Sequence, residues 1–140
     1  MRSSIREHVS DDCFRLIISP GIDGGLICSS SQGEKVCIRF AEFLSIDDPG
    51  KKTYRFTIIF EADPDEKIYG LGLHEEDIFN YRGRRQYLIP ANMKIPVPVL
   101  ISSRKYACLF NHGCAMIFDD SSEGMKIVGE CAEKIDLYII

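Results

Sequence analysis

The amino-acid sequence predicts an all-β protein, an antiparallel β-sandwich of about ten short strands. In several segments apolar residues alternate with polar ones, which is the period of two that a half-buried strand requires. Groups of glycine, proline, asparagine and aspartate separate these segments at the ~8–12-residue spacing that is typical of sandwiches and barrels. No segment has the apolar stripe of period 3.6 that indicates an amphipathic helix.

The clearest strand is predicted over residues 53–61. Its large apolar side chains, Tyr54, Phe56, Ile58 and Phe60, all fall on one face when the chain is extended. A helix would scatter the same four residues around its surface. We therefore expect Phe56, in the middle of this face, to anchor the core.

Residues 1–12 are polar and aperiodic, and we expect a flexible segment before a single sandwich domain over residues 13–140. Segments 106–110 and 115–118 are expected to pair as a hairpin, because residues 111–113 supply types that tolerate positive φ. The other expected strands lie at 13–19, 26–29, 36–40, 125–131 and 134–140, with more inside the stretch 66–111.

Length and composition exclude several classes of protein. A chain of 140 residues, 45% hydrophobic and 27% charged, is a single globular domain rather than a disordered chain or a fibre. A net charge of -4 provides no basic field for nucleic acid or anionic lipid. No apolar run reaches the ~18 residues of a membrane helix, and residues 1–12 lack the apolar centre of a secretory signal. We expect neither nucleic acid nor membrane as a partner.

The six cysteines are scattered, without the Cys-x-x-Cys or cysteine–histidine spacing of a zinc site. Several have apolar neighbours, which favours free, mostly buried thiols over a disulfide framework. Free thiols and the absence of an Asn-x-Ser/Thr sequon point to the cytoplasm. No metal or cofactor site is expected. The six residues are Cys13, Cys28, Cys37, Cys108, Cys114 and Cys131.

The stretch 66–111 carries the most specific pattern in the chain. Gly70 and Gly72 flank Leu71, which suits a backbone that bends or is approached closely. A dinucleotide-binding loop would need a third glycine where Glu75 stands, and no helix start follows. A phosphate-binding role is therefore excluded.

Four blocks in this stretch occur in a fixed order. They read Glu66-Lys-Ile-Tyr-Gly-Leu-Gly72, Asn80-Tyr-Arg-Gly83, Ile95-Pro-Val-Pro-Val-Leu-Ile-Ser-Ser-Arg104 and Tyr106 to Asn111. The ordered set resembles the N-terminal domain of glycoside hydrolase family 31, the family of α-glucosidases and α-xylosidases. Residues 133–140 resemble the last strand of that domain. One departure is Leu73, where many relatives have glutamate.

The resemblance implies a galactose-mutarotase-like β-sandwich that packs on a (β/α)8 barrel. In the family the barrel carries the catalytic aspartates and acts on α-linked oligosaccharides or glycosides, as a retaining α-glycosidase. No stretch here alternates strands and helices, so we expect no activity from this chain alone and a barrel after Ile140 in a longer parent. The family's rim loop corresponds to residues 88–94, which makes Pro90, Asn92, Met93 and Lys94 the candidate site residues.

The residues themselves leave two other functions open. An independent carbohydrate-binding module would need exposed aromatics on one face, and Tyr81, Tyr87 and Tyr138 are candidates. A protein-interaction sandwich would act through its edge strands. The acidic groups are interpreted as solvated turns rather than as a catalytic pair or a metal site. They are His74 to Asp77, Asp47–Asp48, Asp63 to Glu66 and Asp119–Asp120.

Overall fold

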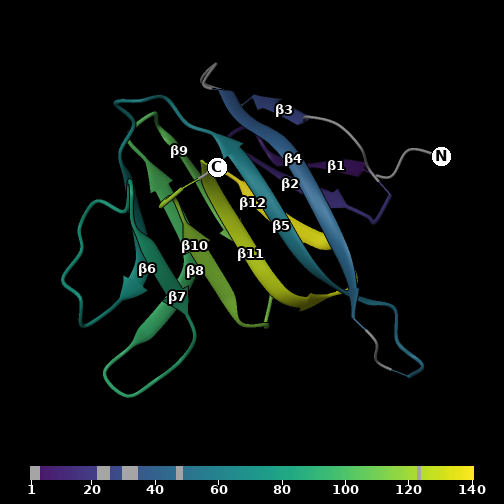
Figure 1. Cartoon of the computed structure of the whole chain (residues 1–140). Helices are drawn as coiled ribbons and strands as arrows, with labels where there is room; N and C mark the ends of the chain where they lie inside the picture. Colours follow the sequence, from purple (N-terminus) through teal and green to yellow (C-terminus); the bar gives the residue numbers. More distant parts are fainter. Residues whose placement is uncertain (1–3, 22–25, 30–34, 47–48, 123) are drawn as a thin grey trace.

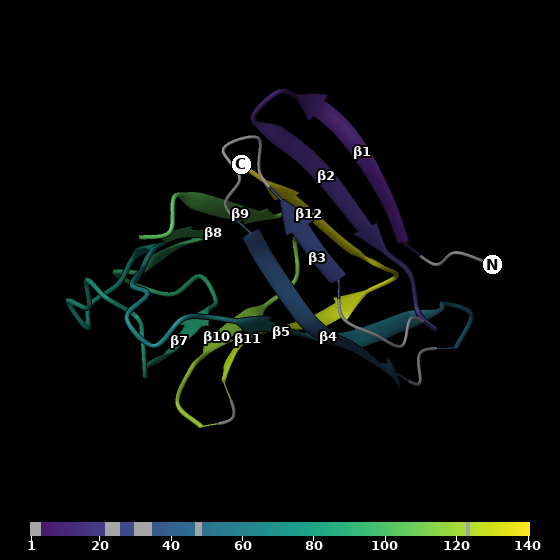
Figure 2. The same ribbon diagram turned by 90° about the horizontal axis from the view of Figure 1, so that it is seen from above.

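Two antiparallel six-stranded sheets pack face to face in the computed structural model, which describes residues 4–21, 26–29, 35–46, 49–122 and 124–140. The layers are visible in Figures 1 and 2. The predicted all-β sandwich is confirmed, with twelve strands in place of about ten. Within the described ranges, no helix is long and apolar enough to cross a membrane.

The strands follow one another along the chain with short connections. They are β1 (Ser4–Ser10), β2 (Cys13–Ile18), β3 (Leu26–Ser29), β4 (Lys35–Ile46), β5 (Thr53–Glu61), β6 (Ile68–Leu73), β7 (Arg85–Leu88), β8 (Ile95–Ser102), β9 (Tyr106–Phe110), β10 (Met116–Asp119), β11 (Met125–Ala132) and β12 (Ile135–Ile139). We call the sheet with the order β1-β2-β12-β9-β8-β6 sheet A and the sheet with the order β3-β4-β5-β11-β10-β7 sheet B. The strands β6, β7 and β8 lie at the end of the sandwich away from β1 (Figures 1 and 2).

The core lies between the inner faces of the two sheets. Strand β5 contributes Phe56, Ile58 and Phe60 to it, as its alternation predicts, and Phe56 is fully buried. Gly129 on the neighbouring β11 stands opposite Phe56, and any Cβ at this glycine would overlap the Phe56 ring. The aromatic side chain therefore fills the space that Gly129 leaves.

The segment before Cys13 departs from the expectation of a flexible segment over residues 1–12. Strand β1 pairs with β2 at the edge of sheet A, with Ile5 opposite Ile17 and His8 opposite Phe14. The described side chains of β1 are exposed. Such a strand is held by backbone hydrogen bonds at the sheet edge and needs no apolar alternation, so periodicity does not detect it.

The expected hairpin of 106–110 with 115–118 is wrong. Strand β9 pairs with β8 and β12 in sheet A, whereas β10 pairs with β11 and β7 in sheet B. Residues 111–115 therefore cross from one sheet to the other. His112 secures the crossing, because its ring packs 4.8 Å from that of Phe56 and its Nε2 accepts the Asp136 N–H at 3.0 Å.

The thiols agree in part with the prediction. Cys13, Cys108, Cys114 and Cys131 form no disulfide, and Cys108 is buried. Cys131 is exposed, contrary to the expected burial, and it lies within the register shift between Gly129 and Ala132 of β11. The side chains of Cys28 and Cys37 lie outside the described part of the chain.

Candidate functional site

The Gly70–Leu71–Gly72 block and the proline-rich start of β8 form one joint between two strands. All three residues of the block have positive φ, at 98°, 63° and 90°. A Cβ on Gly70 would lie 2.5 Å from the carbonyl oxygen of Val99, and a Cβ on Gly72 would overlap the carbonyl oxygen of Ile95. The predicted close backbone approach is confirmed, and it explains why glycine is needed at both positions.

Glu66 opens the same block and is buried beneath the joint. Its Oε1 accepts hydrogen bonds from Ser102 Oγ at 2.5 Å and from the Tyr106 hydroxyl at 2.6 Å. Its Oε2 accepts the Asp63 N–H at 3.0 Å. Burial, followed by the bond to Glu66, raises the pKa of Tyr106 well above its usual range. This carboxylate is occupied by its own chain and holds the start of β6 against β8 and β9.

Arg82 links the Asn-x-Arg-Gly block to the rest of the sandwich. Its Nε donates to Asp120 Oδ2 at 2.8 Å, and its Nη1 donates to the carbonyl oxygens of Asp63 and Glu66 at 2.7 and 2.8 Å. The Gly83 N–H donates to the same Asp120 oxygen at 2.7 Å. The arginine therefore has an architectural role, because it joins this block to Asp120 and to the backbone before β6.

The four candidate site residues lie together in the connection between β7 and β8. The Lys94 N–H donates to the Ala91 carbonyl oxygen at 3.1 Å and closes a turn in which Met93 has φ 61°. Pro90, Asn92 and Met93 are exposed. Lys94 Nζ lies 2.5 Å from Glu76 Oε1 in the β6–β7 connection, and this bond lowers the pKa of Glu76 and raises that of Lys94.

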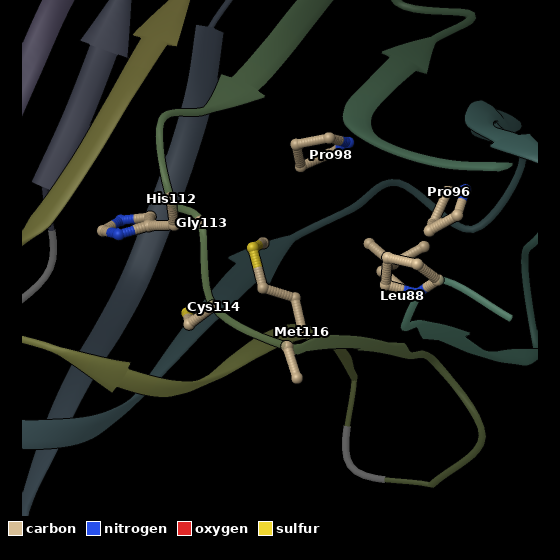
Figure 3. A pocket seen from close by; sticks show the side chains of 9 residues that line it. Leu88, Pro96, Pro98, His112, Gly113, Cys114 and Met116 are labelled. Carbon is tan, nitrogen blue, oxygen red and sulfur yellow. The ribbon is translucent and has the colours of Figure 1, made fainter.

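An open pocket of about 200 Å³ lies between this connection and the crossing segment 111–115. Its lining residues, all within the described ranges, carry no charged side chain. The His112 ring points away from Pro96 and Pro98 (Figure 3), and burial lowers its pKa, which favours the neutral ring. The pocket suits apolar contact rather than acid–base chemistry. It is lined by Leu88, Pro90, Pro96, Pro98, His112, Gly113, Cys114, Ala115 and Met116.

Comparison with known proteins shows which proteins this sequence is similar to. No family model matches the sequence. α-Xylosidase A of Aspergillus niger is 38% identical over 52 residues, which are 37% of this chain and 7% of that protein. A family 31 glucosidase of Pseudescherichia vulneris is 36% identical over 64 residues, 46% of this chain and 12% of that protein. The chain is related to glycoside hydrolase family 31.

Solved structures show that the fold of the family-31-related domain extends over most of the chain. The family 31 α-xylosidase of Xanthomonas citri matches with a TM-score of 0.65 and 23% identity, over 88% of this chain and 13% of that one. The xylosidase of Aspergillus niger matches with a TM-score of 0.68 and 19% identity, over 90% and 20%. The chain thus spans a fifth or less of these relatives.

The three candidate tyrosines of the family-31-related domain do not share the exposed face that a carbohydrate-binding module would need. Tyr81 is only 2% exposed and packs edge-on against Phe118 in the core. Tyr87 lies on β7 of sheet B beneath Arg85, and Tyr138 lies on β12 of sheet A. Tyr81 is therefore no candidate for an exposed sugar-binding face, because its side chain points inward.

The acidic candidates of the family-31-related domain have partners within the fold. His74 Nε2 lies 2.6 Å from the Leu71 carbonyl oxygen, so the histidine supports the glycine joint. Asp119 accepts from the hydroxyl and the N–H of Ser121, while Asp120 holds Arg82. Among the described residues no His/Cys/Asp/Glu group could hold a metal ion. Asp47 and Asp48 lie outside the described residues.

One feature of the domain is missed by the sequence analysis. Six large apolar side chains around β6 and β8 remain between 42% and 80% exposed, and we call them the outer apolar patch. The sequence does contain a sign of this patch. In β8 the apolar residues at odd-numbered positions alternate mainly with prolines and a leucine, where a half-exposed strand would have polar residues. The six are Leu73, Phe79, Met93, Ile95, Val97 and Ile101.

Proposed function

We propose that this chain is the N-terminal accessory domain of a family-31 retaining α-glycosidase, which packs on the (β/α)8 catalytic barrel of the same protein. One observation carries the proposal: the relatives match this chain over most of its length, but the matched part is only a small fraction of each relative. The chain matches 84% of its own length to the α-xylosidase of Saccharolobus solfataricus, at 26% identity, yet spans 17% of that protein. The remainder of such an enzyme has room for the barrel.

The proposal assigns the reaction to the barrel and not to this domain. Glycoside hydrolysis needs two carboxyl groups about 5–5.5 Å or 6.5–9.5 Å apart across one sugar. Glu66 and Asp120 are engaged with hydroxyl, amide and guanidinium groups of their own fold. The substrate would be an α-linked oligosaccharide or glycoside, and the enzyme would work in the cytoplasm, which the free thiols support.

The turn 91–94 is proposed to shape the rim of the sugar pocket. Pro90 limits the backbone before the turn, and the bond of Lys94 to Glu76 ties it to the neighbouring connection. The turn thereby presents Asn92 and Met93 to the outside in a defined geometry. The Asn92 amide can donate to and accept from sugar hydroxyls, and the Met93 thioether offers a soft apolar surface to a sugar face.

Kinetics of the full-length enzyme test this role. Asn92→Ala combined with Met93→Ala should alter the ratio of kcat/KM between α-glycosides with different aglycones by up to ~10-fold, because a rim contacts the leaving group. The matched control changes two exposed residues of another connection, Lys51→Ala with Lys52→Ala, and should leave the ratios unaltered. If the Asn92→Ala, Met93→Ala variant keeps the wild-type kcat/KM for every glycoside, as the control variant should, the turn is only a connection between strands.

The 140-residue chain alone should not turn over aryl α-glucosides or α-xylosides. Turnover by the pure chain would place the catalytic groups inside this domain and refute the assignment to a barrel.

A further inference from the structure

The outer apolar patch is centred on β6 and β8 of sheet A, and its members Phe79 and Met93 belong to the connections that adjoin these strands. Leu73 of β6 stands opposite Ile95 of β8, and at the other end of the same pair Tyr69 stands opposite Ile101. Cross-strand partners share a face of the sheet, so the patch runs along both strands on the side away from the core. Phe79 joins it through Tyr69, with the two rings 4.8 Å apart.

The composition of this patch is that of an interface. The solvated face of an antiparallel sheet is normally polar, yet here Leu73 of β6 is 70% exposed and Ile95 of β8 is 64% exposed. Phe79 and Met93, in the adjoining connections, are 80% and 74% exposed. Aromatic residues and methionine are enriched in the centres of protein interfaces, and charged residues are depleted there. The Lys94–Glu76 ion pair stands beside Met93 and Ile95, where an interface would have its polar rim.

A protein surface fits this patch better than a carbohydrate. Sugar recognition needs convergent hydrogen-bonding groups beside a flat aromatic face. The patch consists of apolar side chains, and the planes of Tyr69 and Phe79 are inclined to each other by 45°. Two inclined rings among aliphatic side chains make an uneven apolar surface, which another packed protein surface can match.

We propose that the outer apolar patch is the surface on which the catalytic domain of the same enzyme sits, an inference that rests on the proposed function. Two observations select this occupant. The solved relatives are several times longer than the part matched here, which covers 13% to 25% of the structures compared, so a parent of that length adds a large further mass to this domain. Met93 belongs both to the patch and to the turn 91–94, so a catalytic domain on the patch brings that turn to its pocket rim.

Hydroxyl-radical footprinting with mass spectrometry tests the inference on the isolated 140-residue chain and on the full-length protein. Phe79 and Met93 should be oxidised on the order of 5-fold more slowly in the full-length protein, because interface centres exclude water. Tyr87, which is exposed on sheet B, serves as the internal control and should be oxidised at the same rate in both samples. Sedimentation of the isolated chain, run in parallel, reports self-association.

The possible results separate the two levels of proposal. Equal oxidation of Phe79 and Met93 in both samples, with full glycosidase activity of the longer protein, would overturn the patch as docking surface and leave the proposed function standing. A full-length protein without a barrel or activity would overturn both. Protection of Phe79 in an isolated chain that sediments as a dimer would replace the catalytic domain by a second copy and also overturn the inference.

Discussion

The outer faces of the sandwich differ sharply between two regions, although both belong to half-exposed antiparallel strands. On sheet B, Arg55 of β5 pairs with Glu130 of β11, and the outward-facing Val128, which stands opposite Thr57, is nearly covered. Around β6 and β8 of sheet A, the outward-facing apolar side chains of Ile95 and Val97 stay 64% and 42% exposed.

Sheet A itself contains both kinds of surface. On its β2–β12 half, Arg15 Nε and Nη2 donate to the two carboxylate oxygens of Asp136 at 2.8 and 2.7 Å, and Asn111 adds a third bond. The outer apolar patch lies on the other half, around β8 and β6. The contrast therefore follows position in the sandwich rather than sheet identity, and it is the reason for proposing the β6–β8 end as the contact surface.

The largest expected effect lies under both regions, in the shared core. Phe56→Ala should lower the free energy of unfolding by ~3–5 kcal/mol, because Phe56 is fully buried between Gly129 and the His112 ring. Denaturant unfolding of the isolated chain measures this loss. An unaltered midpoint would mean that the inner face of β5 is not the core, and the distinction between inner and outer faces would collapse.

The second effect concerns the joint beneath the apolar region. Gly72→Ala should destabilise the chain by at least ~2 kcal/mol, because the residue has φ 90° and a Cβ would overlap the carbonyl oxygen of Ile95. Gly50→Ala is the matched control, since it has φ 92° but open space around the added carbon. If both variants lose the same free energy of unfolding, the close approach of β8 to Gly72 contributes nothing to the requirement for glycine.

The third effect concerns the charged half of sheet A and depends on pH. The hydrogen bonds from Arg15 are the main cause that lowers the pKa of Asp136. A lowered folded pKa means that the stabilisation is complete above the ordinary value of ~3.9 and disappears as the pH falls through the folded value. Asp136→Asn should therefore be less stable than the wild type at pH 7, and thermal melting should show the gap closing under acid. A gap that stays constant down to pH 2 would contradict this origin.

The smallest effect is expected at the exposed ion pair of sheet B. Arg55 and Glu130 are both about half exposed, 3.6 Å apart, and such pairs contribute about 0–1 kcal/mol. Glu130→Gln should shift the denaturation midpoint barely, and added salt should erase the difference. A loss as large as that of Phe56→Ala would show that charges, and not the core, hold sheet B.

Local pattern was enough to predict the strands whose two faces differ in polarity. Strand β5 is the clearest case, since Phe56, Ile58 and Phe60 point inward while Arg55 and Glu61 are exposed. The need for glycine at positions 70 and 72 was also predictable, because few other reasons place two glycines around one apolar residue. Both predictions depend on neighbours within a few positions.

Features that depend on distant partners were not predictable in this way. Strand β1 lacks apolar alternation and exists through its pairing with β2. The 111–115 crossing has the composition of a hairpin turn. However, β9 is paired on both edges, with β8 and β12, so β10 belongs to the other sheet. The candidate residues 90–94 are brought together by a short turn, but what that turn faces depends on protein outside this domain.

The most direct test of the central claim is a structure of the full-length protein, in which the solvent exposure of both regions can be compared. We expect Phe79 and Ile95 to be buried against the catalytic domain, and Leu44 and Tyr87 of sheet B to stay exposed. The turn 91–94 should border the sugar pocket. A catalytic domain seated on the outer face of sheet B, with the outer apolar patch open to water, would contradict it.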